Sequence, residues 1–306
     1  MIYTVTLNPA VDCTVAVSGM NIGAVNRADR QVLMAGGKGI NMSVILHRLG
    51  VPTMALGFTG GETGRLLRSL LDKSGCPYDF TDLEGQNTRV NVKLKNGGEE
   101  TEINGRGPEI SSEDMSGFMK KLGDTLNDGD ILILAGSIPA SVNDTVYADI
   151  MAMFADRDIR IAADTSGKAL TSLLPHRPFL IKPNGHELGE IIGSVVVTHE
   201  DAFIGAKALQ QMGARNVMVS LAGDGAVLLA EGGRRYECRA PKGTVVNSVG
   251  AGDSMLAGFL AGLEKYGDIE KSLVLGTASG SSTAFSEGLA EAEQILAMYE
   301  QLRALV

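Results

Sequence analysis

The chain has 306 residues, of which 44% are apolar and 21% charged, and this composition is typical of a globular protein with a sizeable core. Its formal net charge of −9 argues against nucleic acid or an anionic membrane as the main partner, because both select an excess of basic residues. Its 3 cysteines are far apart and form no CxxC pair, which argues against a disulfide framework and a zinc site.

The chain opens on the strand-like run IYTVTL, with no signal peptide and no apolar run of the roughly 18 residues that a membrane span needs, so we expect a cytoplasmic protein. Short apolar runs then alternate with amphipathic runs. The expected strands are 2–7, 53–57, 131–135, 159–163, 179–181 and 217–221. The expected helices are 40–49, 64–74, 143–154, 185–191, 200–212, 250–264, 269–285 and 291–302. This alternation predicts an α/β fold of three layers, a mostly parallel sheet with helices on both faces.

Two segments break the alternation. Residues 11–34 contain short β-like runs broken by Gly and Asn, and residues 87–103 alternate apolar and polar side chains around NGG, which is typical of a hairpin. We expect segments 11–34 and 87–104 to form a small inserted β-sheet, a lid on one domain that spans 1–306. Because open sheet edges invite pairing, this sheet also predicts a homodimer.

The run VVNSVGAGDSMLAGF places a carboxylate where backbone N–H groups converge on an anion. The amides of Gly250, Ala251 and Gly252, at the start of a helix, would neutralise charge that develops on a transferring phosphoryl group. Asp253 would then be the base that accepts a proton from the attacking hydroxyl. The alternative is a glycine turn whose aspartate only caps the helix.

Two further glycine-rich turns follow strands. MAGGKGINMSVIL places three glycines around Lys38, with Asn41 in the first helical turn, which suits the binding of a polyhydroxy compound, and a plain strand-to-helix turn is the alternative. It is not a P-loop, because Gly39 follows the lysine where Ser or Thr would stand. SLAGDG, residues 220–225, suits backbone contact with a nucleotide, and a plain turn is the alternative.

The run IKPNGHE ends a strand with Lys182 and then offers Asn184 and Glu187 three residues apart on one helical face. Such a pair could hold a cluster of magnesium, water and phosphate, because Mg²⁺ binds few protein carboxylates directly. The alternative for Asn184 is a simple helix N-cap.

Together these motifs resemble the ribokinase/phosphofructokinase-B family of sugar kinases over essentially the whole chain. NSVGAGDSMLAGF is similar to the C-terminal signature of that family, and AGGKGIN to its N-terminal one. NPAVD and INGRGPEIS resemble the branch that acts on phosphorylated ketohexoses, nearest to the 1-phosphofructokinases and then to the tagatose-6-phosphate kinases. The resemblance implies a ribokinase-like fold, ATP as co-substrate and Mg²⁺.

The resemblance also implies a role for individual residues. It assigns Asp253 as the base and Gly250, Ala251 and Gly252 as the anion hole. The implied sugar contacts are Asp12, Gly37 and Asn41 to hydroxyls, Lys38, Arg89 and Ser137 to the phosphate of the substrate, and Arg27 from a segment that can cross to a partner subunit. The implied ATP contacts are Lys182, Asn184, Ser220, Ala222, Gly223, Gly225 and Gly252, with Glu187 and Asn184 near Mg²⁺ through water. Ala222 departs from the family, which has Gly there.

The expected reaction is therefore ATP-dependent phosphorylation of fructose 1-phosphate to fructose 1,6-bisphosphate. Tagatose 6-phosphate and fructose 6-phosphate remain alternative substrates, because each needs the same cationic handle and the same base. A nicotinamide oxidoreductase lacks its GxGxxG after the first strand. A non-catalytic sugar-binding regulator would lack the base, and Asp253 is present.

Overall fold

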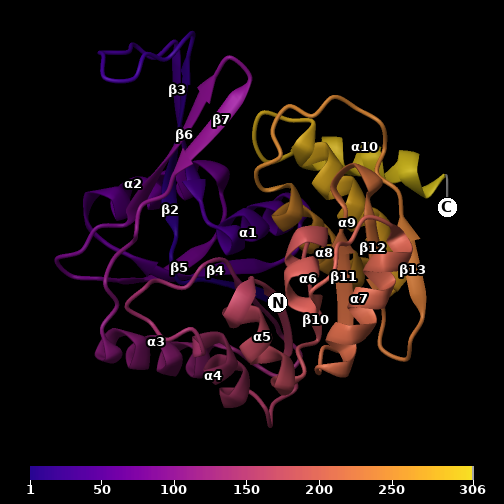
Figure 1. The fold of residues 1–306 in the computed structure, drawn as a ribbon. Helices are drawn as coiled ribbons and strands as arrows, with labels where there is room; N and C mark the ends of the chain where they lie inside the picture. Colours follow the sequence, from indigo (N-terminus) through magenta and orange to yellow (C-terminus); the bar gives the residue numbers. More distant parts are fainter. Residues whose placement is uncertain (305–306) are drawn as a thin grey trace.

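A computed structural model describes residues 1–304 of the chain. Within these residues the main sheet has nine strands in the order β13-β12-β11-β10-β9-β8-β1-β4-β5 (Figure 1). The strands are β1 (Ile2–Thr6), β4 (Thr53–Thr59), β5 (Tyr78–Asp82), β8 (Ile131–Ala135), β9 (Arg160–Asp164), β10 (Leu180–Ile181), β11 (Asn216–Ser220), β12 (Ala226–Leu229) and β13 (Arg235–Cys238). Neighbours from β5 to β11 pair in parallel, whereas β12 and β13 are antiparallel. The mostly parallel sheet that the sequence predicts is confirmed.

Helices cover both faces of this sheet because its strands are apolar on both sides. One face packs against α3, α4, α5, α6 and α7, and the other against α1, α8, α9 and α10. The helices are α1 (Lys38–Arg48), α2 (Gly61–Ser74), α3 (Ser112–Thr125), α4 (Val146–Met153), α5 (Gly167–Leu173), α6 (Gly185–Ile192), α7 (His199–Gln211), α8 (Ala251–Tyr266), α9 (Ile269–Ala284) and α10 (Ala292–Arg303). Two short 3₁₀ turns are η1 (Leu174–His176) and η2 (Ala222–Asp224). No helix in residues 1–304 is long and apolar enough to cross a membrane.

The two segments that break the sequence alternation form a separate small sheet, in the order β3-β2-β6-β7 (Figure 1). Its strands are β2 (Ala10–Val17), β3 (Arg30–Gly36), β6 (Arg89–Asn96) and β7 (Glu99–Ile103). The turn between β6 and β7 places Gly97 and Gly98 at positive φ, as a tight hairpin requires. In Figure 1 this sheet rises beside the main body, above β4 and β5.

Three strands and two helices lie outside the sequence predictions. β12 and β13 have only four residues each, and β5, with the sequence YDFTD, has one buried residue and lacks the apolar run of the predicted strands. The helix α3 does carry a local sequence signal. Ser111 and Asp114 form a capping box at its start, and its buried residues Phe118 and Leu122 are one helical turn apart. The other omitted helix, α5, has only seven residues.

Candidate active site

A cavity of about 1010 Å³ lies where the carboxyl ends of the parallel strands meet the start of α8. In open α/β sheets this edge is where ligands bind. The cavity gathers sequence-predicted residues from distant parts of the chain, namely Lys38, Lys182, Asn184, Glu187, Ser220, Ala222, Gly223, Gly225, Ala251, Gly252 and Asp253. Residues predicted for the nucleotide and the predicted base therefore border one space.

Two glycines with close neighbours stand at the start of α8. Gly250 has a φ of 78°, and a Cβ there would lie 2.8 Å from Leu289 Cδ2. A Cβ on Gly252 would lie 3.2 Å from the ammonium of Lys182, so that cation stands beside the helix terminus. The amide of Ala251 already donates to the carbonyl of Ser248 at 3.2 Å. Within residues 1–304 the amides of Gly250 and Gly252 have no such partner, and these two are available to an anion.

Asp253 is buried in the first turn of α8. Its Oδ2 accepts a hydrogen bond of 2.8 Å from Asn41 Nδ2, which fixes the plane of the carboxylate. Burial, reinforced by the negative charge of Asp164, raises the pKa of Asp253 to about 6, against the opposing effect of Lys38 and Asn41. A carboxylate with this pKa is ionised at neutral pH and is a stronger proton acceptor than an ordinary aspartate.

A buried carboxylate that the sequence analysis missed organises the cations of the cavity. Asp164 ends β9, and its two oxygens lie 2.8 Å from Lys38 Nζ and 3.1 Å from Lys182 Nζ. Burial alone would raise the pKa of Asp164, but the charges of Lys182 and Lys38 outweigh it and lower that pKa. Because β9 and β10 are parallel neighbours, Asp164 and Lys182 reach the same edge. The sequence signal was an acid directly after an apolar strand.

The small sheet carries Asp12 on β2, close to the start of α1. Asp12 Oδ1 accepts a hydrogen bond of 2.9 Å from Asn91 Nδ2 on β6. A Cβ on Gly36 would lie 2.5 Å from Asp12 Cγ, so the glycine makes room for this carboxylate. Gly37, with a φ of 126°, joins β3 to α1. The structure thus brings Asp12, Gly37 and Asn41 to the junction of the small sheet and α1.

The other residues predicted to bind the sugar phosphate, Arg89, Ser137 and Arg27, lie in separate parts of the structure. Arg89 is partly buried, and burial lowers its pKa. Its Nε and Nη1 donate to the backbone carbonyls of Asn8 and Gly105 at 3.1 and 3.2 Å. Ser137 is exposed just after β8, whereas Arg27 lies in the exposed loop between β2 and β3, apart from the other predicted residues.

Asn184 and Glu187 form a reciprocal cap on α6, so the N-cap alternative for Asn184 is confirmed. Asn184 Oδ1 accepts from the amide of Glu187 at 2.8 Å, and Glu187 Oε2 accepts from the amide of Asn184 at 2.9 Å. Both residues also line the cavity. Residues 1–304 contain no cluster of three His, Cys, Asp or Glu that could hold a metal ion alone. One carboxylate and one amide at the cavity wall fit a hydrated Mg²⁺ that takes its other ligands from phosphate and water.

The turn after β11 has unusual backbone geometry. Ala222 lies in η2 with a φ of 48°, a conformation that favours glycine. Gly225 has a φ of 92°, and a Cβ there would overlap the carbonyl oxygen of Cys238. A glycine at position 222 would adopt this left-handed backbone conformation with less strain. This chain keeps the same turn with alanine.

Comparison with known proteins matches residues 5–295 to the family described as pfkB family carbohydrate kinase. A 1-phosphofructokinase of Bacillus subtilis is 45% identical over 303 residues, which is 99% of each chain. A D-tagatose-1-phosphate kinase of Bacillus licheniformis is 36% identical over 296 residues, 96% of each chain. Among solved structures, the tetrameric inhibited form of phosphofructokinase-2 from Escherichia coli superposes with a TM-score of 0.89 at 25% identity, covering 99% of both chains.

Proposed function

The chain belongs to the pfkB family of carbohydrate kinases, and on this premise we propose that it transfers the terminal phosphoryl group of ATP to fructose 1-phosphate. The product is fructose 1,6-bisphosphate. The observation that supports this best is the pairing of Asp253 with Asn41 at the start of α8, beside two free amides and a lysine. Identity of 45% to a 1-phosphofructokinase favours fructose 1-phosphate over the tagatose and fructose 6-phosphates.

In this proposal Asp253 removes the proton from the attacking hydroxyl of the sugar. Because Asn41 holds Oδ2, the carboxylate cannot rotate freely, and its orientation toward the cavity is set before the substrate arrives. The proton moves from the hydroxyl to Asp253 as the new O–P bond forms, while the bond between the terminal phosphorus of ATP and its bridging oxygen breaks and ADP leaves. A pKa near 6 leaves the base ionised at pH 7.

The phosphoryl group that is transferred gains stabilisation from the start of α8. The amides of Gly250 and Gly252 and the helix dipole are aimed at the charge on its oxygens. Lys182 adds a full positive charge beside Gly252, and Asp164 holds that lysine and Lys38 in place. The role of Ala251 is then to shape the turn, since its amide is already bonded.

ATP would occupy the cavity along Asn184 and the turn 220–225. We propose Mg²⁺ as its companion, held through water by Glu187 with Asn184. When bound, Mg²⁺ neutralises charge on the phosphate oxygens. Glu187 keeps Oε1 outside the helix cap, and this oxygen is the one available to metal-bound water.

The sugar would lie between α1 and the small sheet. Asp12, Gly37 and Asn41 bind its hydroxyls in this proposal, and Arg89, with Ser137 and Lys38, binds its phosphate. Arg89 retains Nη2 beyond its two bonds to backbone carbonyls. The small sheet would act as a lid that excludes water from the reacting phosphate.

We further propose a homodimer that forms through the outer face of the small sheet. That face carries exposed apolar side chains, since Leu33, Val90 and Ile103 have exposed fractions of 40%, 40% and 62%. In such a dimer we propose that Arg27, from the exposed loop between β2 and β3, contacts the partner subunit. The cytoplasm is the proposed location, supported by Cys13, Cys76 and Cys238, which are free thiols.

The direct test measures ADP release with ATP and a panel of acceptors. The panel contains fructose 1-phosphate, fructose 6-phosphate, tagatose 1-phosphate, tagatose 6-phosphate and free fructose. We expect the highest kcat/KM with fructose 1-phosphate, and loss of that activity in Asp253→Asn. Higher kcat/KM with another ketohexose phosphate would replace the substrate. Absence of ADP with every acceptor would support a non-catalytic regulator instead.

A further inference from the structure

We propose that Lys93 is a positioning residue, which holds the Asp12 carboxylate in the orientation that binds the sugar hydroxyls. The inference rests on the proposed function of Asp12 and extends it to a residue of β6. Lys93 has only 7% of its side chain exposed, although it belongs to a small sheet that stands beside the body of the protein.

The Lys93 side chain is directed toward Asp12 rather than toward the residues that pair with Lys93 in the sheet. In the strand register Lys93 lies opposite Thr14 of β2 and Glu102 of β7. Its ammonium nevertheless lies 3.2 Å from Asp12 Oδ2, one row away, and 3.9 Å from Glu102 Oε1. The lysine is therefore nearer to the more buried carboxylate, since Asp12 is 13% exposed and Glu102 44% exposed.

Lys93 completes a set of restraints on Asp12. Asn91 donates to Oδ1 at 2.9 Å, Lys93 lies against Oδ2, and Gly36 leaves space under the carboxylate carbon. With both oxygens held from β6, the remaining lone pairs of Asp12 have fixed directions. A carboxylate restrained in this way recognises hydroxyl groups by their positions as well as by their presence.

Stability alone does not explain a buried ion pair here. Removing two charges from water costs free energy that their attraction only partly returns, and apolar residues of similar volume often replace such a pair without loss of stability.

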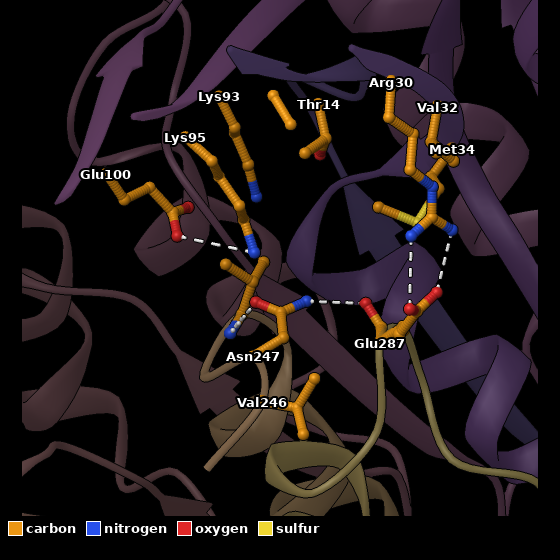
Figure 2. Close-up of a pocket in the computed structure, with 13 residues that line it drawn as sticks. Thr14, Arg30, Val32, Met34, Lys93, Lys95, Glu100, Val246, Asn247 and Glu287 are labelled. Atoms are coloured by element: carbon orange, nitrogen blue, oxygen red, sulfur yellow. Dashed lines mark hydrogen bonds and ion pairs between the residues drawn. The ribbon is translucent and has the colours of Figure 1, made fainter. Parts of the chain in front are cut away.

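Lys93 also borders a cavity of about 250 Å³ between the small sheet and the body, with Lys95 and Arg30 on the same sheet face (Figure 2). In Figure 2 these side chains point toward Asn247 and Glu287 of the body.

The chain offers a matched control for Lys93. Lys95 lies two residues further along β6 on the same face, lines the same cavity, and pairs with Glu100 at 3.8 Å. Within the described residues 1–304 it forms no ion pair with Asp12, so a substitution there tests loss of a lysine from this face without loss of the restraint.

The experiment is a double-mutant cycle with Lys93→Met, Asp12→Asn and the combined variant, plus Lys95→Met and Lys93→Arg. Steady-state kinetics use whichever ketohexose phosphate the parent enzyme phosphorylates, so a different preferred sugar would refute only the proposed substrate. For Lys93→Met we expect KM for the sugar phosphate to rise at least about tenfold, as for loss of one charge-assisted contact, while KM for ATP stays within about twofold. Lys95→Met is expected to match the parent, and Lys93→Arg to recover most of the affinity.

The combined variant decides between positioning and other roles. If Lys93 acts through Asp12, the combined variant is no weaker than Asp12→Asn alone. Additive losses would mean that Lys93 contacts the substrate directly, and this would overturn the proposal. A Lys93→Met variant with a lowered Tm and equal effects on both substrates would show a structural role, with the same consequence. An Asp12→Asn variant with unchanged KM would refute the role of Asp12 and the inference with it.

Discussion

Asp253→Asn changes one oxygen of the proposed base to an amide nitrogen and keeps its size, so it separates catalysis from packing. Without a group to take the proton, we expect kcat to fall by about 10² to 10⁴-fold, the usual contribution of a positioned base. The carbonyl oxygen of the new side chain can still accept from Asn41, and KM for ATP is expected to change little. In the parent enzyme kcat/KM should fall about tenfold per pH unit below pH 6, the pKa of Asp253, and the variant should lack this limb.

The same substitution is expected to stabilise the fold. The pKa of Asp253 rises from 3.8 to about 6 on folding, and the folded state therefore favours the protonated form. The sign follows from that direction: the cost of ionising the buried carboxylate is absent below pH 4, grows as pH rises, and is complete above pH 6. A rise of this size corresponds to about 3 kcal/mol, and asparagine does not bear this cost.

Thermal and urea unfolding of both proteins at pH 5 and pH 8 test this reasoning. At pH 8 we expect the Tm of Asp253→Asn to exceed that of the parent by about 2–5 °C, with a smaller difference at pH 5. A variant less stable than the parent at pH 8 would refute the account of the buried carboxylate. A kcat within a few-fold of the parent would refute the assignment of the base.

Three further predictions concern other parts of the site. Arg89→Ala should raise KM for the sugar phosphate at least about tenfold at constant KM for ATP, since one charge-assisted contact is lost; steady-state kinetics that show both substrates equally weakened would assign Arg89 to the fold. Asp164→Asn leaves two lysines side by side without their carboxylate, and should lower the free energy of unfolding by about 3 kcal/mol, measured in urea, and raise KM for ATP; an unchanged urea midpoint would contradict it. Saturating sugar phosphate should slow hydrogen exchange in 11–34 and 87–103 if the small sheet closes, whereas unchanged exchange there would mean that it is scaffold only.

The parts of the fold that the sequence predicted are those with a strong local pattern. Strands such as β8 are apolar on both faces, and β8 agrees with its prediction at both ends. Segments 11–34 and 87–103 are predicted to form a separate sheet because both break the alternation of apolar and amphipathic runs, and 87–103 has the pattern of a hairpin. The structure confirms that they pair with each other, through the parallel neighbours β2 and β6.

The missed features depend on contacts between distant residues. Asp164 gains its importance from Lys38, 126 residues away, and no local spacing relates the two. Similarly, the sequence placed three amides in the anion hole, but it could not show that the amide of Ala251 is used by Ser248 within the turn. The pairing of Lys93 with Asp12 could not be predicted from local sequence either, because the two residues lie on different strands. Tertiary proximity decides each case.

The small sheet arises from two insertions, β2 with β3 and β6 with β7, both within the first 103 residues. Most residues proposed for the acceptor sugar therefore belong to the N-terminal third. Those proposed for ATP lie between Lys182 and Asp253, in segments that follow strands of the main sheet. Such a separation along the chain lets mutation or recombination alter the acceptor while the donor site stays intact. It offers a physical route by which one scaffold could diversify into kinases for many sugars.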